Sequence, residues 1–518
     1  MKSPKKITSA IVGVAAALGL AACSTTVADS STTTTSATAA ATAQSAVSTG
    51  TSTATSALLK DNAESHAEAD DAAYDSTDAT ITLKDGASTT TSDTGVSVDG
   101  DTVTITAPGT YVLTGTLTDG TVVVSSDAEG KVRLVLDNAS ITNSTGAAID
   151  IEAADEAVVV LQDGTTNALA DGSGYDTSAQ DAPNAALFSM ADLTIGGTGS
   201  LTVTGNTDDG IASKDGLVIL DGTISVTAAD DGIRGKDYLI VNGGSVTVSA
   251  ADDGLKSDNE TDDTVGYVSL AGGSVKISAG DDGVHAEGDL AISGGTLTVA
   301  TSNEGIEGAN IVISGGATTI TSSDDGVNAS AGTGSGGGMG GGMQDDGSLL
   351  QITGGTLVVD ASGDGLDSNG SIAMSGGTVV VSGPTMNGNG SLDSNGGITV
   401  AGGTLIAAGS SGMAEAPGSE SAQGWLQVNF SPTVAAGETL SIVSDGKVIA
   451  SFTTTKEVAN LVFAGDGITP GSSYEIYLGG TLAAETTGTF SLGGSTDGAS
   501  SLGSVTAGQA TSSGMGGH

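Results

Sequence analysis

Adjacent pairs of aspartates followed by a glycine recur along the middle of the chain. The stretch VSAADDGLKSDNE, residues 248–260, is one copy, and related copies read VTAADDGIRGKD, ISAGDDGVHAEG and ITSSDDGVNAS. Carboxylate oxygens are the ligands that Ca²⁺ prefers, and it takes about six to eight oxygens at about 2.3–2.6 Å. The repeated pairs therefore predict calcium sites, with these candidate ligands: Asp208, Asp209, Asp230, Asp231, Asp252, Asp253, Asp281, Asp282, Asp324 and Asp325.

The same tripeptide is also common turn chemistry, in which Asp bonds its own turn and Gly adopts a left-handed conformation. That alternative explains one Asp and the Gly, but not the second acid. Like charges stacked about 4.8 Å apart repel each other, and residues 277–446 contain no Lys or Arg. Magnesium demands tighter geometry, and zinc would find only His285 and no cysteine in the body of the chain. We therefore expect calcium as the cofactor, with plain turn chemistry as the alternative.

The acid pairs follow a regular period along the chain. Asp208, Asp230 and Asp252 are evenly spaced, whereas the step from Asp252 to Asp281 is longer because it contains the insertion NETDDTVGY. Each unit has two runs of alternating apolar and polar residues, such as LIVNGGS and ISVTAADDGI, which predict strands with one buried face. The fold class is therefore all-β, and the period predicts a single-stranded parallel β-helix with about 22 residues per coil.

The position within each unit predicts which side chains face the core. Counted from the first acid, the fourth residue is apolar and the sixth is small, so both should point inward. The fourth residues are Ile211, Ile233, Leu255, Val284, Ile306, Val327 and Leu366. The sixth residues are Ser213, Gly235, Ser257, Ala286, Gly308, Ala329 and Ser368. The fifth and seventh residues should face solvent, namely Arg234, Lys236, Lys256, Asp258, His285, Glu287, Glu307 and Asp367.

The N-terminus has the pattern of an exported lipoprotein. MKSPKK is basic, ITSAIVGVAAALGL is apolar but too short for a membrane span, and LAAC resembles a lipobox ending at Cys23. Residues 1–22 are predicted to be a lipoprotein signal peptide, with lipidation of Cys23; an ordinary secretory signal is the alternative. We expect a protein anchored to the cell membrane by lipid and facing the extracellular side. Cys23 is the sole cysteine, which excludes an intrachain disulfide.

Composition divides the rest of the chain. Residues 23–77, rich in Ser, Thr and Ala, predict a flexible tether. The β-helix is expected over residues 78–424, a small C-terminal β cap over 425–490, and a disordered tail over 491–518. The Gly- and Met-rich insertion at residues 331–343 is expected to be a flexible loop rather than a copper site.

The chain is strongly acidic, with 61 Asp and Glu against 14 Lys and Arg and a formal net charge of −47. This charge argues against nucleic acid or an anionic membrane surface as partners. It favours bound cations, basic partners or simple solubility.

Several longer strings resemble one family of bacterial secreted proteins. They include APGTYVLTGTLTDGTVVV, VRLVLDNASIT, AALFSMADLTIGGTGSLTVTGN and GTLIAAGSSGMA, within residues 78–485. The chain is similar to the carbohydrate-binding domain-containing proteins typified by a clostridial cellulose- and pectin-binding β-helix. The resemblance implies a right-handed β-helix related to family 9 pectate lyases, bound calcium on the Asp pairs, and binding of acidic polysaccharide and cellulose without known cleavage. Asn303–Glu304 and Gly363–Asp364 depart from the acid-pair motif.

A non-catalytic, calcium-dependent carbohydrate-binding protein is the first functional hypothesis. Only Tyr238 and Tyr267 are aromatic between residues 192 and 412, so a flat cellulose surface fits less well than a uronate polymer bridged by calcium. The candidate glycan-binding residues are Arg234, Lys236, Lys256 and Asp258. The bases among them could equally be salt-bridge partners of the acids.

Two other classes of function stay open. A calcium-dependent polysaccharide lyase would need a base, and Lys214, Lys236 or Lys256 could serve. A structural or adhesive surface rod would need neither catalysis nor glycan binding. We expect no enzymatic activity, and the sequence leaves the oligomeric state open.

Overall fold

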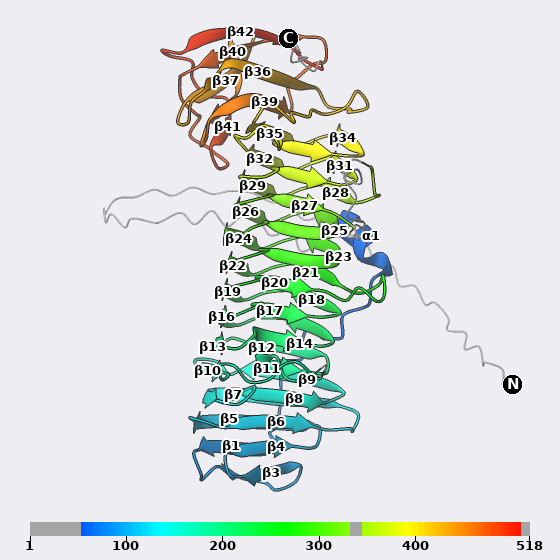
Figure 1. The fold of residues 1–518 in the computed structure, drawn as a ribbon, viewed down its shortest axis with the longest axis vertical. Helices are drawn as coiled ribbons and strands as arrows, with labels where there is room; N and C mark the ends of the chain where they lie inside the picture. The colour runs from blue at the N-terminus through cyan, green and yellow to red at the C-terminus, as the bar shows by residue number, and fades with distance from the viewer. Residues whose placement is uncertain (1–52, 180, 332–343, 509–518) are drawn as a thin grey trace, which may run out of the picture. The chain divides into compact units, whose positions relative to one another are not determined.

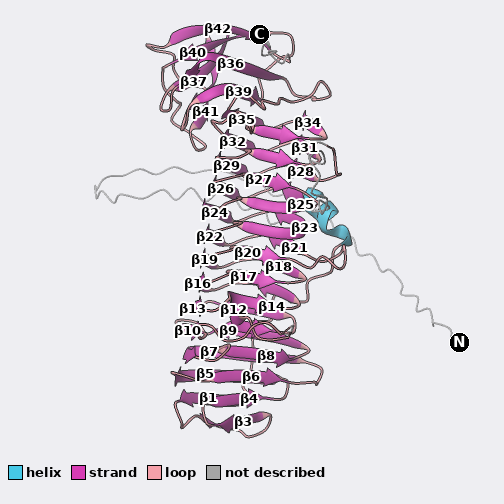
Figure 2. Cartoon of the chain, in the orientation of Figure 1, coloured by secondary structure: helices cyan, strands magenta, loops and turns pink. Residues whose placement is uncertain are grey.

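The computed structural model describes residues 53–179, 181–331 and 344–508, which are nearly all β (Figures 1 and 2). Cys23, the predicted signal peptide, the first part of the predicted tether and almost all of the Gly- and Met-rich insertion lie outside the described residues. One long sheet contains most of the strands, and most of its pairings are parallel. No described helix is long and apolar enough to cross a membrane.

Three parallel ladders form the central part of this sheet, and the chain visits them in turn. The first ladder consists of β10 (Thr166–Ala170), β13 (Ser200–Gly205), β16 (Thr223–Ala228), β19 (Ser245–Ser249), β22 (Ser274–Ser278), β24 (Thr296–Thr301), β26 (Ala317–Ser322), β29 (Thr356–Ala361), β32 (Thr378–Ser382) and β35 (Thr404–Gly409).

The second ladder carries the acid turns at its start. It consists of β11 (Ala185–Ser189), β14 (Asp209–Ser213), β17 (Ile233–Gly235), β20 (Leu255–Ser257), β23 (Val284–Ile292), β25 (Ile306–Ile313), β27 (Val327–Ala329), β30 (Leu366–Ser368) and β33 (Leu392–Ser394).

Strands β23 and β25 are long enough to continue into the third ladder. Its other members are β12 (Leu193–Gly197), β15 (Gly216–Ile219), β18 (Tyr238–Val241), β21 (Tyr267–Leu270), β28 (Leu349–Ile352), β31 (Ser371–Met374) and β34 (Gly397–Val400). Successive strands of the first ladder pair Thr223 with Ser245 and Ser245 with Ser274, which matches the spacing of the acid pairs in the sequence.

The N-terminal strands extend the same sheet and end in antiparallel hairpins. They are β1 (Ala79–Lys84), β2 (Thr89–Thr90), β3 (Val96–Asp99), β4 (Thr102–Ile105), β5 (Gly109–Leu117), β6 (Thr121–Ser125), β7 (Lys131–Thr142), β8 (Ile149–Ala153) and β9 (Glu156–Leu161). Antiparallel pairing of β1 with β2 and of β3 with β4 closes this end of the ladders.

Alternation along the strands produces the core, as the sequence predicts. Strands such as β16 and β19 bury every second side chain. The predicted inward column of Ile, Leu and Val at the fourth position is at most 1% exposed, and Ser257 and Ser368 at the sixth position are fully buried. The fifth and seventh positions differ from the prediction, because their side chains are half-buried instead of facing open solvent, namely Arg234, Lys236, Lys256, Asp258, His285, Glu287, Glu307 and Asp367.

The glycine of each acid turn has a different role from the one that the sequence suggests. It does not adopt the left-handed conformation, which belongs instead to the second glycine of the GG turns, such as Gly244 (φ +80°) and Gly273 (φ +74°). A Cβ on Gly254 would lie 2.4 Å from a methyl carbon of Ile277 and 2.6 Å from the carbonyl oxygen of Gly283. The acid-turn glycine is therefore required by close packing against the neighbouring ladder and repeat.

The C-terminal strands form a smaller β unit that joins the first ladder. β36 (Trp425–Val434) and β39 (Val458–Ala464) stay in the long sheet, and β39 pairs antiparallel with β35. The other members form a second sheet: β37 (Thr439–Ser444), β38 (Lys447–Thr453), β40 (Ser473–Leu478), β41 (Phe490–Leu492) and β42 (Ser500–Thr506). Because β42 pairs with β40, residues 491–508 are ordered strand and turn, which corrects the prediction of a disordered tail there.

Residues 53–78, here called the N-terminal strap, lie along the third ladder, in contrast to the predicted flexible tether. The strap begins with helix α1 (Thr53–Leu58) and a short 3-10 helix (Leu59–Asp61) and then runs without regular structure. The backbone N–H of His66 donates to the Tyr238 hydroxyl at 3.0 Å, and Asp71 is 1% exposed and ion-paired with Lys131. Specific polar contacts and small side chains thus fix a segment whose composition alone suggests disorder.

Candidate cation-binding acid column

The second acid of each turn lies deeper than the first. Asp209, Asp231, Asp253 and Asp282 are at most 6% exposed, whereas the first acids of the same turns are half-buried or exposed. The second position remains acidic where the pair motif breaks, at Asn303–Glu304 and Gly363–Asp364. We call these second acids the inner acid column: Asp209, Asp231, Asp253, Asp282, Glu304, Asp325 and Asp364.

Backbone hydrogen bonds hold the inner acid column in register. The N–H of Asp231 donates to Oδ1 of Asp209 at 3.3 Å, and the N–H of Asp253 donates to Oδ1 of Asp231 at 3.2 Å. The N–H of Asp282 likewise donates to Oδ1 of Asp253 at 2.9 Å. The carboxylates of Asp209, Asp231 and Asp253 therefore link neighbouring repeats, whereas the turn-chemistry alternative expected each Asp to bond its own turn.

Built-in bases neutralise the first half of the column. They occupy the fifth position of three successive repeats, where the register aligns Arg234 with Lys256 and Lys256 with His285. The Arg234 guanidinium lies 3.8 Å from Asp209, and Nζ of Lys256 lies 2.7 Å from Asp253 and 3.2 Å from Asp231. In these repeats, Arg234 and Lys256 thus supply positive charge beside the inner acids, a role that the sequence alone suggested for calcium.

His285 lies between two carboxylates at the centre of the column. Its Nδ1 is 3.0 Å from Oδ2 of Asp282 and 3.0 Å from Oε2 of Glu307. Burial opposes a charged imidazole, but the hydrogen bonds to both carboxylates outweigh it and raise the pKa of His285 to about 10. At neutral pH, His285 is therefore a cation that continues the series begun by Arg234 and Lys256.

The second half of the column has no such bases. At the fifth position, the strand pairing aligns Asn328 with Asp367 and Asp367 with Asp393. Acids therefore stand here in place of the bases of the first half. We call this group the C-terminal acid cluster: Asp325, Asp364, Asp367, Asp393 and Glu415. Among the residues that the structure describes, no Lys, Arg or His forms an ion pair with any of them.

The pKa values reflect this uncompensated charge. Burial, followed by repulsion from neighbouring carboxylates, raises the pKa of Asp367 to about 8. Burial raises the pKa of Asp364 to about 7 and that of Glu415 to about 7, and nearby acids add to both shifts. Such shifts show that the cluster favours either protons or an added cation.

The predicted calcium ligands come together in part. Oxygens of Asp208, Asp209 and Asp230 lie within 4.8 Å of one another, as do oxygens of Asp230, Asp231 and Asp252. The other five predicted ligands belong to neither group: Asp253, Asp281, Asp282, Asp324 and Asp325. Asp281 and Asp324 are exposed.

The donor set at the first group suits a hard cation. Besides its carboxylates, Asn184 is 7% exposed and donates through Nδ2 to Asp209 at 2.7 Å. Its Oδ1 is buried and has no hydrogen-bond partner among the described residues. All-oxygen groups of this kind fit Ca²⁺ better than zinc.

Two of the three predicted glycan-binding bases are already engaged in ion pairs within the protein. Arg234 Nη2 lies 2.5 Å from Asp258, and Lys256 is surrounded by inner-column acids. Lys236 is half-buried, and it forms no ion pair with a described residue. Arg234, Lys256 and Asp258 therefore form salt bridges, as the alternative interpretation expected. Direct contact of Lys236 with a glycan remains a prediction.

The two tyrosines of the ladders form no open platform for sugar rings. Tyr238 and Tyr267 stack on each other with ring centroids 5.3 Å apart and are at most 4% exposed. The Tyr267 hydroxyl donates to the carbonyl of Ala63 in the N-terminal strap at 2.9 Å. Both tyrosines therefore pack the strap against the third ladder.

Sequence reasoning missed Glu304, Asp364, Asp393 and Glu415 and placed His285, Glu307 and Asp367 in solvent. The register of the repeats contained a signal for two of them, because the second acid persists at Glu304 and Asp364 although the first does not. The burial of the fifth position could not be read from alternation alone, since it depends on how the turn folds over it.

Comparison with known proteins finds a family match for the part of the chain that contains most of this column. Residues 99–347 match the model of a family described as carbohydrate-binding domain-containing protein. This segment is similar to that family. A protein of the same description from Acetivibrio thermocellus is 41% identical over 136 residues, which is 26% of this chain and 48% of the relative. The chain thus spans about half the length of that relative.

A solved structure is also similar to the chain. It is described as the polysaccharide lyase-like protein from C. thermocellum, in a gadolinium derivative, and is 33% identical. The similarity covers 46% of this chain and 96% of that chain, with a TM-score of 0.44. Within this protein, the carbohydrate-binding family segment includes the base-neutralised part of the column and Asp325, whereas the rest of the C-terminal acid cluster lies beyond it.

Proposed function

We propose that this protein is a non-catalytic, calcium-dependent binder of acidic polysaccharide at the cell surface. The observation that carries the proposal is the C-terminal acid cluster, five carboxylates with no basic partner among the described residues, on a chain with a carbohydrate-binding family segment. A divalent cation there would neutralise the acids and leave coordination positions for the carboxylates of a uronate polymer.

In the second half of the column, Asp364, Asp367, Asp393 and Glu415 would attract such a cation by their combined charge, and their oxygens would have to draw closer together to share it, because they are not among the groups that already lie within 4.8 Å of one another. Asp208, Asp209 and Asp230 would hold another in the first half. When bound, calcium supplies positive charge and open oxygen coordination. The protein supplies fixed carboxylates, because backbone N–H groups such as that of Gly390, which donates to Asp364 at 2.5 Å, set their orientation.

We further propose that the three ladders are the faces of a right-handed parallel β-helix, with each coil as long as one sequence repeat. The consecutive parallel pairings support this fold. Anchoring of the mature protein through lipid on Cys23, and exposure on the extracellular side, complete the proposal and rest on the sequence from Met1 to Cys23.

Affinity electrophoresis in gels that contain polygalacturonate or soluble cellulose derivatives tests the proposed function. We expect migration to slow in the polygalacturonate gel with Ca²⁺ and to recover with EDTA. Equal migration in all gels, or retardation that EDTA does not change, would overturn calcium-dependent binding of an acidic glycan.

A lyase is the second candidate, and Lys214 is the observation that favours it. Burial and the nearby Arg234 guanidinium lower the pKa of Lys214, and its Nζ lies 5.6 Å from the centre of the Phe188 ring. The described residues give Lys214 no ion pair, in contrast to Lys256, whose pKa is raised by inner-column acids. An amine with a lowered pKa beside a cation site could remove the proton next to a uronate carboxyl group while the glycosidic oxygen leaves.

Ultraviolet absorbance of the unsaturated product decides between the two candidates. Incubation with polygalacturonate and Ca²⁺ should give no absorbance increase if the protein only binds. An increase that Lys214→Ala abolishes, and Lys236→Ala does not, would establish the lyase instead.

A further inference from the structure

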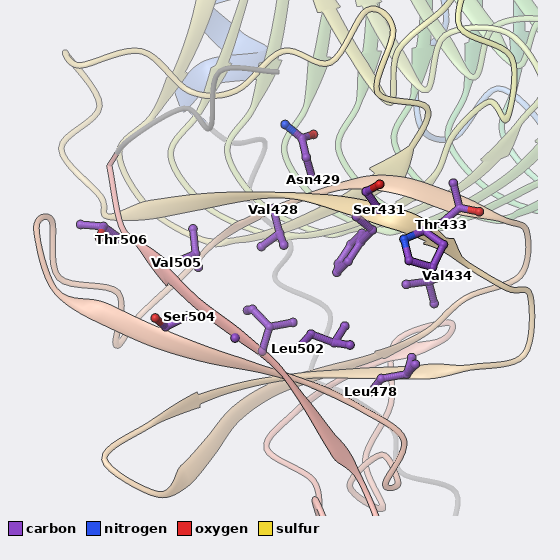
Figure 3. A pocket seen from close by; sticks show the side chains of 14 residues that line it. Val428, Asn429, Ser431, Thr433, Val434, Leu478, Leu502, Ser504, Val505 and Thr506 are labelled. Carbon is purple, nitrogen blue, oxygen red and sulfur yellow. The ribbon is translucent and has the colours of Figure 1, made fainter. Parts of the chain in front are cut away.

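The C-terminal β unit contains a groove that the proposed function does not use. The groove encloses about 690 Å³ between β36 and β42. Figure 3 shows Val428 on the β36 side and Leu502 and Val505 on the β42 side of this space. Phe430, Val434 and Leu478 contribute further apolar surface. Leu502 is 46% exposed, so an apolar side chain of the groove remains open to solvent.

The lining of the groove carries no charge. Its side chains are aliphatic, aromatic, hydroxyl or amide groups, with Ser431, Thr433, Ser504 and Thr506 as the hydroxyl-bearing ones. The chain as a whole has a formal net charge of −47. An uncharged groove on such a protein selects a neutral occupant, because a charged one would lose its hydration without gaining a partner.

One of the strands beside the groove, β42, has an open edge. It lies at the end of its sheet and pairs only with β40 among the residues that the structure describes. β36 and β42 meet at one end, where the N–H of Gly508 donates to the carbonyl of Trp425 at 2.6 Å. Open strand edges present unpaired N–H and C=O groups, which pair readily with another extended chain.

We propose that this groove binds an extended, uncharged polypeptide segment of another protein as an added β-strand. The backbone of the segment would pair with the open edge of β42. Every second side chain would pack on the apolar surface formed by Val428, Phe430 and Leu502. The proposal is independent of the acid column and of calcium, so it can fail while glycan binding stands, and the reverse.

Calorimetric titration of the full chain with blocked synthetic heptapeptides tests this proposal. The first probe alternates Thr and Val, and the second replaces the central Val by Pro, which cannot continue strand pairing. We expect saturable binding of the first peptide, unchanged by EDTA, and affinity at least about tenfold weaker for the second, because one pairing position is lost.

Paired variants locate the binding. Leu502→Asp should weaken binding at least about tenfold by placing a charge in the apolar groove. Leu492→Asp, at a still more exposed leucine of β41 that does not line the groove, should change it less than about twofold. Thr433→Asp, exposed on the β36 side, is a second groove variant, and melting temperatures verify that all variants fold.

Several outcomes would overturn strand addition at this groove. They are the absence of saturable binding by the wild type, equal affinity for both peptides, and equal affinity of the Leu502 and Leu492 variants. Cellohexaose is titrated in parallel. If it saturates the groove and the peptide does not, the occupant is a neutral sugar and the proposal fails.

Discussion

At the scale of single residues, the inner acid column needs positive charge, and the chain supplies it only in part. Lys256 and His285 each contact acids of their own and of a neighbouring repeat. Arg234 contacts Asp209 and Asp258 of the two neighbouring repeats. Asp367 and Asp393 stand in the same register without such a base. Removing a base from the first half of the column should therefore destabilise the folded protein, whereas removing an acid from the second half should stabilise it.

Lys256→Ala should destabilise the protein by about 3 kcal/mol, because it leaves Asp231 and Asp253 buried without their cation. Lys236→Ala is the matched control, since Lys236 forms no ion pair with a described residue, and should cost less than about 0.5 kcal/mol. Urea unfolding measures both. Equal destabilisation by the two variants would contradict a specific role for Lys256.

In the absence of calcium, Asp367→Asn should raise the stability of the folded protein, in contrast to Lys256→Ala. Above about pH 8, where Asp367 is ionised, removing one of several crowded like charges should stabilise the chelated protein by about 1 kcal/mol, and the variant should gain less stability from added Ca²⁺ than the wild type. Thermal melts with EDTA and with Ca²⁺ measure both effects, with the exposed Asp466→Asn as control. Destabilisation by Asp367→Asn in EDTA would contradict this prediction, because it would mean that a favourable contact compensates the negative charge of Asp367.

At the scale of the elements, close packing between repeats sets the sequence of the acid turn. Gly254→Ala would place a methyl group 2.4 Å from Ile277, and we expect a loss of about 1–3 kcal/mol from this overpacking. Gly388, where a Cβ would meet nothing within 4 Å, provides the neutral control as Gly388→Ala. Chemical unfolding of both variants tests the assignment, and a tolerated Gly254→Ala would contradict it.

The sequence was sufficient for the elements that repeat and insufficient for those that do not. Alternation and the regular spacing of the acid pairs predicted the parallel pairing and the inward column from Ile211 to Leu366, because every repeat provides the same constraint. The N-terminal strap could not be predicted, since its order depends on single contacts such as Asp71 with Lys131 and His66 with Tyr238. The acid site could be predicted in part. The sequence shows the acid pairs, but only the distances in the structure show that Arg234, Lys256 and His285 neutralise them.

At the scale of the whole molecule, stability should fall as pH rises when calcium is removed. The pKa values of Asp364 and Asp367 are raised from the usual 3.8 to about 7 and about 8, so the folded state binds more protons than the unfolded state over this range. Their contribution is fully present below about pH 4 and is lost by about pH 8. The raised pKa of His285, about 10 instead of 6.5, acts in the same direction at higher pH.

Melting temperatures in EDTA should therefore decrease from pH 5 to pH 8, and Ca²⁺ should restore more stability at pH 8 than at pH 5, because only the folded state offers the assembled carboxylates. A melting temperature in EDTA that is flat or rises over this range would contradict the raised pKa values. If Ca²⁺ does not change the melting temperature at pH 8, the acid pairs serve only to shape the turns and do not bind calcium.

Calorimetric titration with a short oligogalacturonate tests the central claim most directly. The claim is that the C-terminal acid cluster, loaded with calcium, binds acidic polysaccharide. We predict saturable binding with Ca²⁺, none with EDTA, and loss of binding in the double variant Asp364→Asn, Asp367→Asn, with Asp466→Asn unaffected. Equal binding in EDTA, or full affinity in the double variant, would contradict the claim.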